Sequence, residues 1–257
     1  MSTNDHRATS RVLDILELLA SSKTGYTLTE ISKMIKAPKS SIFPMLHTLE
    51  ERRYISLSEN TLRYRIGVTT FAVGSSYANN QNIISHISAG MTKLVDVCNE
   101  TCSLGILEGS SVLYIAKKDS PQNLRLVTYV GKQVSANCTA LGKSLLCKHS
   151  FEDLENLFPE KLPACTKYSV TDLKLLYNQI KQIETDGFAY ENEEFAEQIQ
   201  CIAVPIMKNG IPIVAVSVST PSFRNDSKKM EIIKRELVNI KLKTELLLRN
   251  SDLDLRP

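Results

Sequence analysis

The sequence lacks the residue patterns on which most enzymes and metal sites depend. Its 257 residues include six cysteines and four histidines, with no CxxC pair, zinc-finger spacing, Gly-rich phosphate loop or nucleophile elbow. No apolar run is long enough to span a bilayer, and the polar N-terminus lacks the apolar segment of a secretory signal. We therefore expect a cytoplasmic protein with reduced, mostly buried thiols, no metal, no cofactor, no membrane partner and no enzymatic activity.

Net charge is also small, but it is unevenly distributed. The formal charge is +3. Residues 1–80 hold ten Lys and Arg against seven Asp and Glu, whereas the remainder holds twenty-one of each. The excess therefore lies in the first third of the chain, which weakly indicates nucleic-acid contact there.

The first third reads as three short helices. Residues 8–20 carry an apolar stripe at the spacing of one helix face. Thr27 and Glu30 form a capping box that begins a second helix. Pro38 suits the first turn of a third helix, where its missing amide costs nothing.

Two β-prone runs, residues 54–57 and 62–66, follow the third helix and are separated by a polar turn. Three helices and a hairpin in about sixty residues are typical of a winged helix-turn-helix, in which the third helix enters the major groove of DNA. A polar helix face alone is weak evidence, but the basic hairpin strengthens it. The predicted DNA-binding residues are Thr27, Lys39, Ser40, Ser41, Phe43, Pro44, His47, Arg52, Arg63 and Arg65.

The rest of the chain predicts an α+β domain with an antiparallel sheet flanked by helices. Asn209-Gly210 between two apolar runs is a strong hairpin signal. Expected strands are 101–107, 112–117, 125–130, 200–207 and 211–219, and expected helices are 83–98, 141–147, 151–157, 172–185 and 232–248. The expected domains are a winged helix-turn-helix at 1–67, a linker helix at 68–81 and an effector-binding domain at 82–257.

Several segments together resemble the IclR family of bacterial transcription regulators. They are Arg11–Glu17, Leu28–Ser32, Pro38–Glu50, Tyr64–Gly67, Asn137–Lys143, Glu193-Glu194 and Cys201–Pro205. The segments at Asp119-Ser120, Asn123–Arg125 and Gly131-Lys132 resemble the subgroup that responds to ketodeoxygluconate and related sugar acids. The resemblance therefore runs through both expected domains.

The resemblance implies a sequence-specific repressor of transcription whose operator binding is modulated by a small organic or sugar acid. It also implies a GAF-like effector domain and assembly into homodimers or homotetramers. The expected partners are thus double-stranded operator DNA, the effector and further copies of the chain. The effector-binding residues that the resemblance implies are Ala140, Leu141, Glu191, Cys201, Ser217 and Ser219.

Three positions depart from the family pattern. Glu191 stands where an aspartate is common, and Gln198 and Arg53 stand where glycines are common. The glycine that Arg53 replaces ends the recognition helix in a left-handed conformation, so Arg53 adopts that conformation at a cost or ends the helix differently. Pro44, inside the same helix, is expected to kink it or to remove a hydrogen bond.

The sequence leaves two other functions open. An enzyme would use Cys138 or Cys201 as its nucleophile with a histidine as base, but no histidine falls beside a catalytic motif. A sensor that acts only through protein partners would bind a ligand and ignore DNA.

Overall fold

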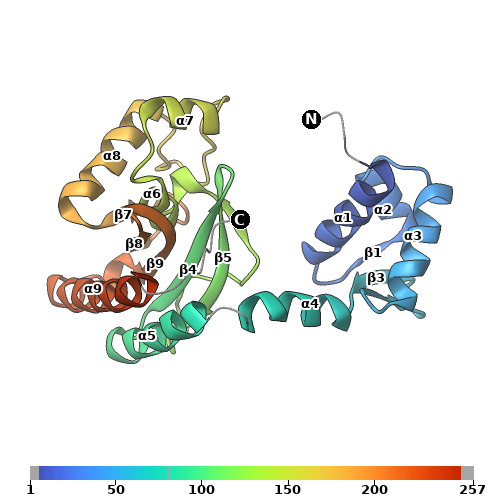
Figure 1. The fold of residues 1–257 in the computed structure, drawn as a ribbon, viewed down its shortest axis with the longest axis horizontal. Helices are drawn as coiled ribbons and strands as arrows, with labels where there is room; N and C mark the ends of the chain where they lie inside the picture. Colours follow the sequence, from blue (N-terminus) through green and yellow to red (C-terminus); the bar gives the residue numbers. More distant parts are fainter. Residues whose placement is uncertain (1–5, 80–81, 250–257) are drawn as a thin grey trace. The chain divides into compact units, whose positions relative to one another are not determined.

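The computed structural model describes residues 6–79 and 82–249, and the chain divides into two compact units, residues 1–80 and 81–257. The first unit contains, in chain order, α1 (Arg7–Ala20), β1 (Tyr26–Thr27), α2 (Leu28–Met34), α3 (Lys39–Glu51), β2 (Ile55–Ser58), β3 (Arg63–Ile66) and α4 (Val68–Asn79). The strands form a three-stranded sheet in the order β1-β3-β2 (Figure 1). The predicted helices and hairpin of the winged helix-turn-helix are confirmed.

The core of the first unit is built from the apolar stripes of its helices. Ile15 of α1, Ile31 of α2 and Leu46 of α3 are fully buried, and Ile55 of the hairpin joins them. Pro38 is the N-cap of α3, one position outside the helical turn in which it was expected. The two-residue strand β1 was not predicted because so short a segment carries no alternation.

The second unit contains α5 (Asn82–Cys98), β4 (Thr101–Glu108), β5 (Ser111–Lys118), β6 (Gln133–Ser135), α6 (Ala140–Leu146), α7 (Phe151–Leu157), α8 (Leu173–Asp186), β7 (Ala189–Asn192), β8 (Ile199–Lys208), β9 (Ile211–Pro221) and α9 (Ser227–Arg249). Its antiparallel sheet has the order β6-β5-β4-β9-β8-β7. Helices α5 and α9 cover one face, and α6 lies against the other, with α7 and α8 beyond it (Figure 1). The expected α+β class is confirmed.

The two faces of this sheet carry different side chains and belong to different cores. Val216 and Val218 of β9 belong to the core beneath α5 and α9, whereas Ala215 belongs to the core around α6. Because side chains alternate along a strand, Ser217 and Ser219 share the face of Ala215. Both serine side chains therefore lie on the face of the sheet that α6 covers.

One predicted strand is wrong. Residues 125–130 form an extended segment outside the sheet, and the strand after β5 is β6. Leu126 and Thr128 are buried, while Val127 and Tyr129 are exposed, so the alternation is real. The carbonyl of Thr128 accepts a hydrogen bond from the Lys117 ammonium at 2.8 Å, so its partner is a side chain and not the backbone of a neighbouring strand.

The turn prediction at residues 209 and 210 is confirmed. Asn209 has a φ of 51° and Gly210 a φ of 79°, between β8 and β9. Two positive φ values in a two-residue loop match the twist of the flanking strands. None of the helices within residues 6–79 and 82–249 is long and apolar enough to cross a membrane.

Candidate functional site

The outer face of α3 carries most of the predicted DNA-binding residues. Lys39, Ser40, Phe43, Pro44 and His47 are exposed, whereas every third or fourth residue of the helix is buried. Phe43 keeps 51% of its surface exposed, an unusual position for a phenyl ring. The structure therefore brings five of the ten predicted residues onto one solvent-facing surface of one helix.

Two side chains of α3 already have partners. The Ser41 hydroxyl donates to the carbonyl of Pro38 at 2.8 Å and accepts a bond from Arg11 of α1 at 3.4 Å. His47 Nδ1 lies 3.6 Å from a carboxylate oxygen of Glu51, one turn along the same exposed face. Ser41 thus links the start of α3 to α1, and His47 lies beside a carboxylate near the end of the helix.

Helix α3 continues through Pro44 to Glu51 as one element. Proline has no amide hydrogen, so the carbonyl of Ser40, four residues earlier, has no helical donor. The carbonyl of Pro44 accepts a bond from the Thr48 hydroxyl at 3.0 Å. The helix ends with Arg53 at a φ of 60°, so the non-glycine residue does adopt the left-handed conformation.

The two wing arginines differ in their contacts. Arg63 donates to both carboxylate oxygens of Glu30 at 3.1 and 3.2 Å and to the carbonyl of Gly25 at 2.7 Å. Arg65 is exposed and donates through Nε to the carbonyl of Thr24 at 3.1 Å. Arg63 therefore holds the wing to α2, and Arg65 is the more available cation.

Thr27 and Arg52 lie away from the outer face of α3. The Thr27 hydroxyl is part of the predicted capping box, in which Glu30 also accepts the Thr27 amide at 2.8 Å. These hydrogen bonds and the Arg63 charge lower the pKa of Glu30. Arg52 caps the C-terminal end of α3, and its guanidinium lies 5.8 Å from the ring centre of Tyr54.

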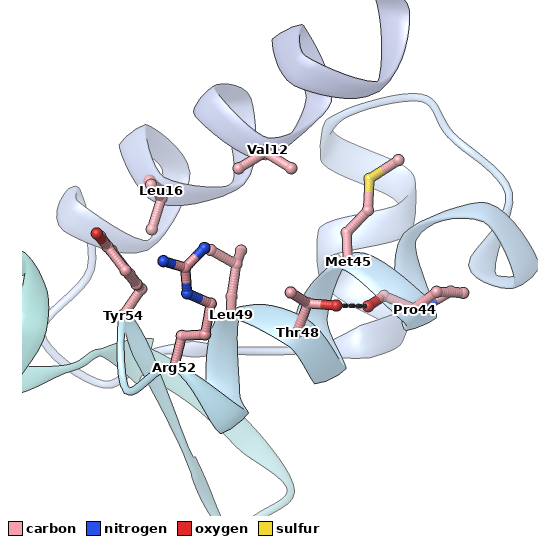
Figure 2. A pocket seen from close by; sticks show the side chains of 8 residues that line it. All are labelled: Val12, Leu16, Pro44, Met45, Thr48, Leu49, Arg52 and Tyr54. Atoms are coloured by element: carbon pink, nitrogen blue, oxygen red, sulfur yellow. Dashed lines mark hydrogen bonds between the residues drawn. The ribbon is translucent and has the colours of Figure 1, made fainter.

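An apolar groove of about 490 Å³ lies between α1 and α3. Figure 2 shows side chains from α1 above the groove facing side chains of α3 and the start of the hairpin. The lining residues are Val12, Leu16, Pro44, Met45, Thr48, Leu49, Arg52 and Tyr54. Sequence reasoning had assigned Pro44 and Arg52 to DNA and had not foreseen this groove.

In the second unit, four polar side chains form a row across the sheet. Thr101 of β4 pairs with Ser219 of β9, which pairs with Cys201 of β8, which pairs with Glu191 of β7. The Cys201 thiol and the Ser219 hydroxyl are 3.2 Å apart. The structure therefore brings together three of the six residues assigned to the effector, from the three strands β9, β8 and β7.

The other three assigned residues lie on or near the same face. Ser217 is buried beside this row on β9, and the buried residues Ala140 and Leu141 begin α6, which packs on that face. Thr139 caps the helix by accepting the Gly142 amide at 2.9 Å.

Glu191 is buried with one of its oxygens unpaired. Oε1 accepts the backbone amides of Glu194 at 2.5 Å and Phe195 at 3.0 Å. Oε2 is buried and has no hydrogen-bond partner among the described residues. Burial raises the pKa of Glu191. An orphaned buried oxygen of this kind calls for a partner that is not part of the chain.

A buried ion pair next to this site was missed by sequence reasoning. Lys143 of α6 is 1% exposed, and its ammonium donates to both oxygens of Glu194 at 2.6 Å. It also donates to the carbonyl of Tyr190 at 3.2 Å. Only the appearance of both residues in the family-like segments pointed to them.

Gln198, the third departure, has a φ of 61°. Its amide donates to Glu193 at 2.8 Å, and its carbonyl accepts the amide of Ser222 at 2.8 Å. The loop after β7 therefore keeps the left-handed conformation that a glycine favours.

The candidate nucleophiles of the enzyme hypothesis are not activated. Burial raises the pKa of Cys138 to about 12 and that of Cys201 well above its ordinary value. A nucleophilic cysteine needs the opposite shift, toward the thiolate.

Comparisons with known proteins match both units. The IclR helix-turn-helix domain matches residues 8–58, and the bacterial transcriptional regulator IclR C-terminal domain matches residues 75–242. The HTH-type transcriptional regulator BhcR of Paracoccus denitrificans is 31% identical over 226 residues, which cover 87% of this chain and 81% of that protein. The HTH-type transcriptional regulator KdgR of Escherichia coli is 27% identical, covering 86% and 84%.

A solved structure has the same fold. The IclR homolog of Microbacterium hydrocarbonoxydans, crystallised with 4-hydroxybenzoate, gives a TM-score of 0.81 at 20% sequence identity. The match covers 95% of this chain and 100% of that one.

Proposed function

Because the chain belongs to the IclR family of bacterial transcriptional regulators, we propose that it represses transcription by binding double-stranded operator DNA through α3. The family and the curated relatives are transcription regulators and not enzymes, with a ligand-binding C-terminal domain. The finer proposal is that a small organic or sugar acid in the second unit modulates operator binding.

The exposed face of α3 is the observation that carries the DNA part of the proposal. Lys39 and Ser40 suit phosphate oxygens at the start of the helix, and Phe43 suits a thymine methyl. Pro44 and His47 complete this surface, and Arg65 reaches DNA from the wing. Thr27, Ser41 and Arg63 support the same surface through their contacts inside the unit, and Arg52 lies at the far end of α3.

A mobility-shift titration with promoter DNA from the gene's own locus tests this directly. We expect a specific complex that competitor DNA of unrelated sequence does not displace. Absence of any complex at low salt, where phosphate contacts are strongest, contradicts the proposal.

The effector part rests on the buried polar face of the sheet. Ser217, Ser219 and Cys201 offer hydroxyl and thiol groups, and Glu191 has an unpartnered oxygen. We propose that these residues, with Ala140 and Leu141, line the effector site. Thermal unfolding of the full chain with a panel of organic and sugar acids tests it, and stabilisation that persists in Ser217→Ala plus Ser219→Ala refutes this site.

We further propose that the first unit pairs with a second copy, giving a homodimer or a tetramer. The groove between α1 and α3 is lined by apolar side chains. Helix α4 exposes Val68 at 67% and Phe71 at 75%. Exposed apolar surface of this kind marks an interface. Sedimentation of wild type and Phe71→Glu tests this proposal. If α4 contributes to the contact between copies, the variant should sediment as a monomer.

A further inference from the structure

Glu191 is the one acid in the proposed effector site that lacks both solvent and a cation. It is 2% exposed, and Oε1 already accepts two backbone amides. The free atom is Oε2, for which no partner exists in the described part of the chain. Oε2 is therefore the atom of Glu191 that is left to bond to a ligand.

Neither of the two cations that lie near this carboxyl group in the described part of the chain, Lys143 and Lys132, is free to neutralise it. The buried ammonium of Lys143 gives two short hydrogen bonds to Glu194 and one to the carbonyl of Tyr190. An ammonium has three donor hydrogens, so its capacity is used. The Lys132 ammonium lies 4.7 Å from the ring centre of Phe195.

One neighbouring charge disfavours the anion of Glu191. The Glu194 carboxylate of the following loop repels it, whereas the hydrogen bonds from the Glu194 and Phe195 amides favour it. The Cys201 thiol of β8 and the Tyr114 phenol of β5 interact with Glu191 electrostatically. Burial raises the pKa of the Cys201 thiol and of the Tyr114 phenol, so both stay neutral near pH 7. A second anion entering this site would meet an uncompensated negative charge if Glu191 were ionised.

We infer that Glu191 serves the effector as a protonated hydrogen-bond donor, with Oε2–H bonded to a carbonyl or carboxylate oxygen of the bound acid. This inference rests on the effector site of the proposed function. The proton comes from solvent, and it stays on Glu191 while the anionic acid is bound. The matching ligand is a monocarboxylate that presents an acceptor oxygen to β7. In the opposite arrangement, Glu191 is ionised and accepts a hydrogen bond from a hydroxyl group of the ligand.

Proton uptake makes the affinity pH-dependent in a defined direction. Bound acid raises the pKa of Glu191 further, so affinity is full below the pKa of the free protein. It falls by about tenfold per pH unit between the free and the bound pKa values.

Calorimetry of the full chain with ketodeoxygluconate, gluconate and 4-hydroxybenzoate tests this in two buffers of different ionisation enthalpy. For each acid that binds, the difference in binding enthalpy between the two buffers gives the number of protons taken up. As the pH rises, we expect this number to approach one proton per bound acid. In Glu191→Gln, whose amide replaces the Oε2–H donor, we expect an affinity within about twofold of wild type and no proton uptake. Glu197→Gln, an exposed glutamate of the same loop, is the matched control and should keep the uptake.

The remaining outcomes contradict either the role of Glu191 or the effector site itself. Binding without proton uptake overturns the role of Glu191 as a protonated hydrogen-bond donor and leaves the effector site standing. Loss of binding in a folded Glu191→Gln chain, with the control unaffected, shows an ionised Glu191 that accepts a hydroxyl and also overturns it. Failure of every acid to bind wild type overturns the effector site and this inference together. The wild-type buffer comparison needs no variant, so misfolding cannot leave the inference undecided.

Discussion

Arg63 and Glu30 face each other through two hydrogen bonds, 3.1 and 3.2 Å long, that join the wing to the start of α2. The same carboxylate accepts the Thr27 amide at the N-terminus of α2. One acidic side chain therefore holds both a helix cap and a wing strand, and the position of the wing depends on its charge.

Replacing Arg63 should affect folding of the first unit more than it affects DNA contact itself. Arg63→Ala removes three hydrogen bonds inside the unit, so we expect a lower midpoint of thermal unfolding. Arg65→Ala removes only the hydrogen bond to the Thr24 carbonyl among the described residues, so it should keep the midpoint near wild type and weaken DNA binding. Circular dichroism melts and mobility shifts on both variants separate the two effects, and equal melting midpoints would contradict this assignment.

The stability of the first unit should depend on pH through Glu30. Its pKa is lowered in the folded chain by the Thr27 and Arg63 contacts. The stabilisation is therefore present above the unfolded pKa of about 4.3 and is lost as pH falls through the folded pKa. We expect wild type to lose more stability than Glu30→Gln when the pH is lowered from 7 to 3, as measured by thermal melts, with Glu17→Gln of α1 as the control.

Lys39 is expected to contact a phosphate. Lys39→Ala should weaken binding to operator DNA and to unrelated DNA by similar factors. It should also lower the slope of log affinity against log salt concentration by about one. Lys174→Ala, an exposed lysine of α8 in the second unit, is the control and should leave both unchanged. A Lys39 variant that loses only sequence preference would place this side chain at a base instead.

Breaking the buried Lys143–Glu194 pair should be costly. Lys143→Met leaves a carboxylate without its counter-charge in the interior, and we expect the free energy of unfolding to fall by about 3–5 kcal/mol. Adding Glu194→Gln should recover part of that loss, because the unpaired charge is then gone. Denaturant titrations of both variants measure this, and Lys148→Met, from a partly exposed pair, should have a much smaller effect.

The left-handed conformation of Gln198 should be improved by glycine. The left-handed conformation destabilises a residue that has a side chain by about 1–2 kcal/mol. Glycine avoids this cost in the folded state, but its more flexible unfolded state offsets part of the gain. We expect Gln198→Gly to raise the free energy of unfolding by up to about 1 kcal/mol. Glu197→Gly, at a position without a positive φ, should lower it.

Local patterns predicted much of this fold because local interactions determine those elements. The stripe of α1, the capping box at Thr27 and the turn at Asn209 each depend on residues a few positions apart. Residues 125–130 show the limit of this reasoning. Their alternation of buried and exposed side chains is present, but a strand also needs a backbone partner, and sequence alternation cannot supply one.

The candidate sites depended on contacts that no local pattern contains. Arg63 and Glu30 are separated by 33 positions, and Lys143 and Glu194 by 51. Residues two positions apart on a strand share a face, so spacing relates Arg63 to Arg65 but does not show that Arg63 bonds to Glu30 of α2. The row from Thr101 to Glu191 likewise exists only because four strands lie in register.

The alternation of β9 has a practical consequence for engineering. Ser217 and Ser219 face the polar side, while Val216 and Val218 face the core beneath α5 and α9. Between Val214 and Ser219, even- and odd-numbered positions can therefore be varied independently, as two libraries that share a backbone. Randomising Ser217 and Ser219 should alter which compound the chain responds to, whereas Val214, Val216 and Val218 should tolerate only apolar side chains of similar size.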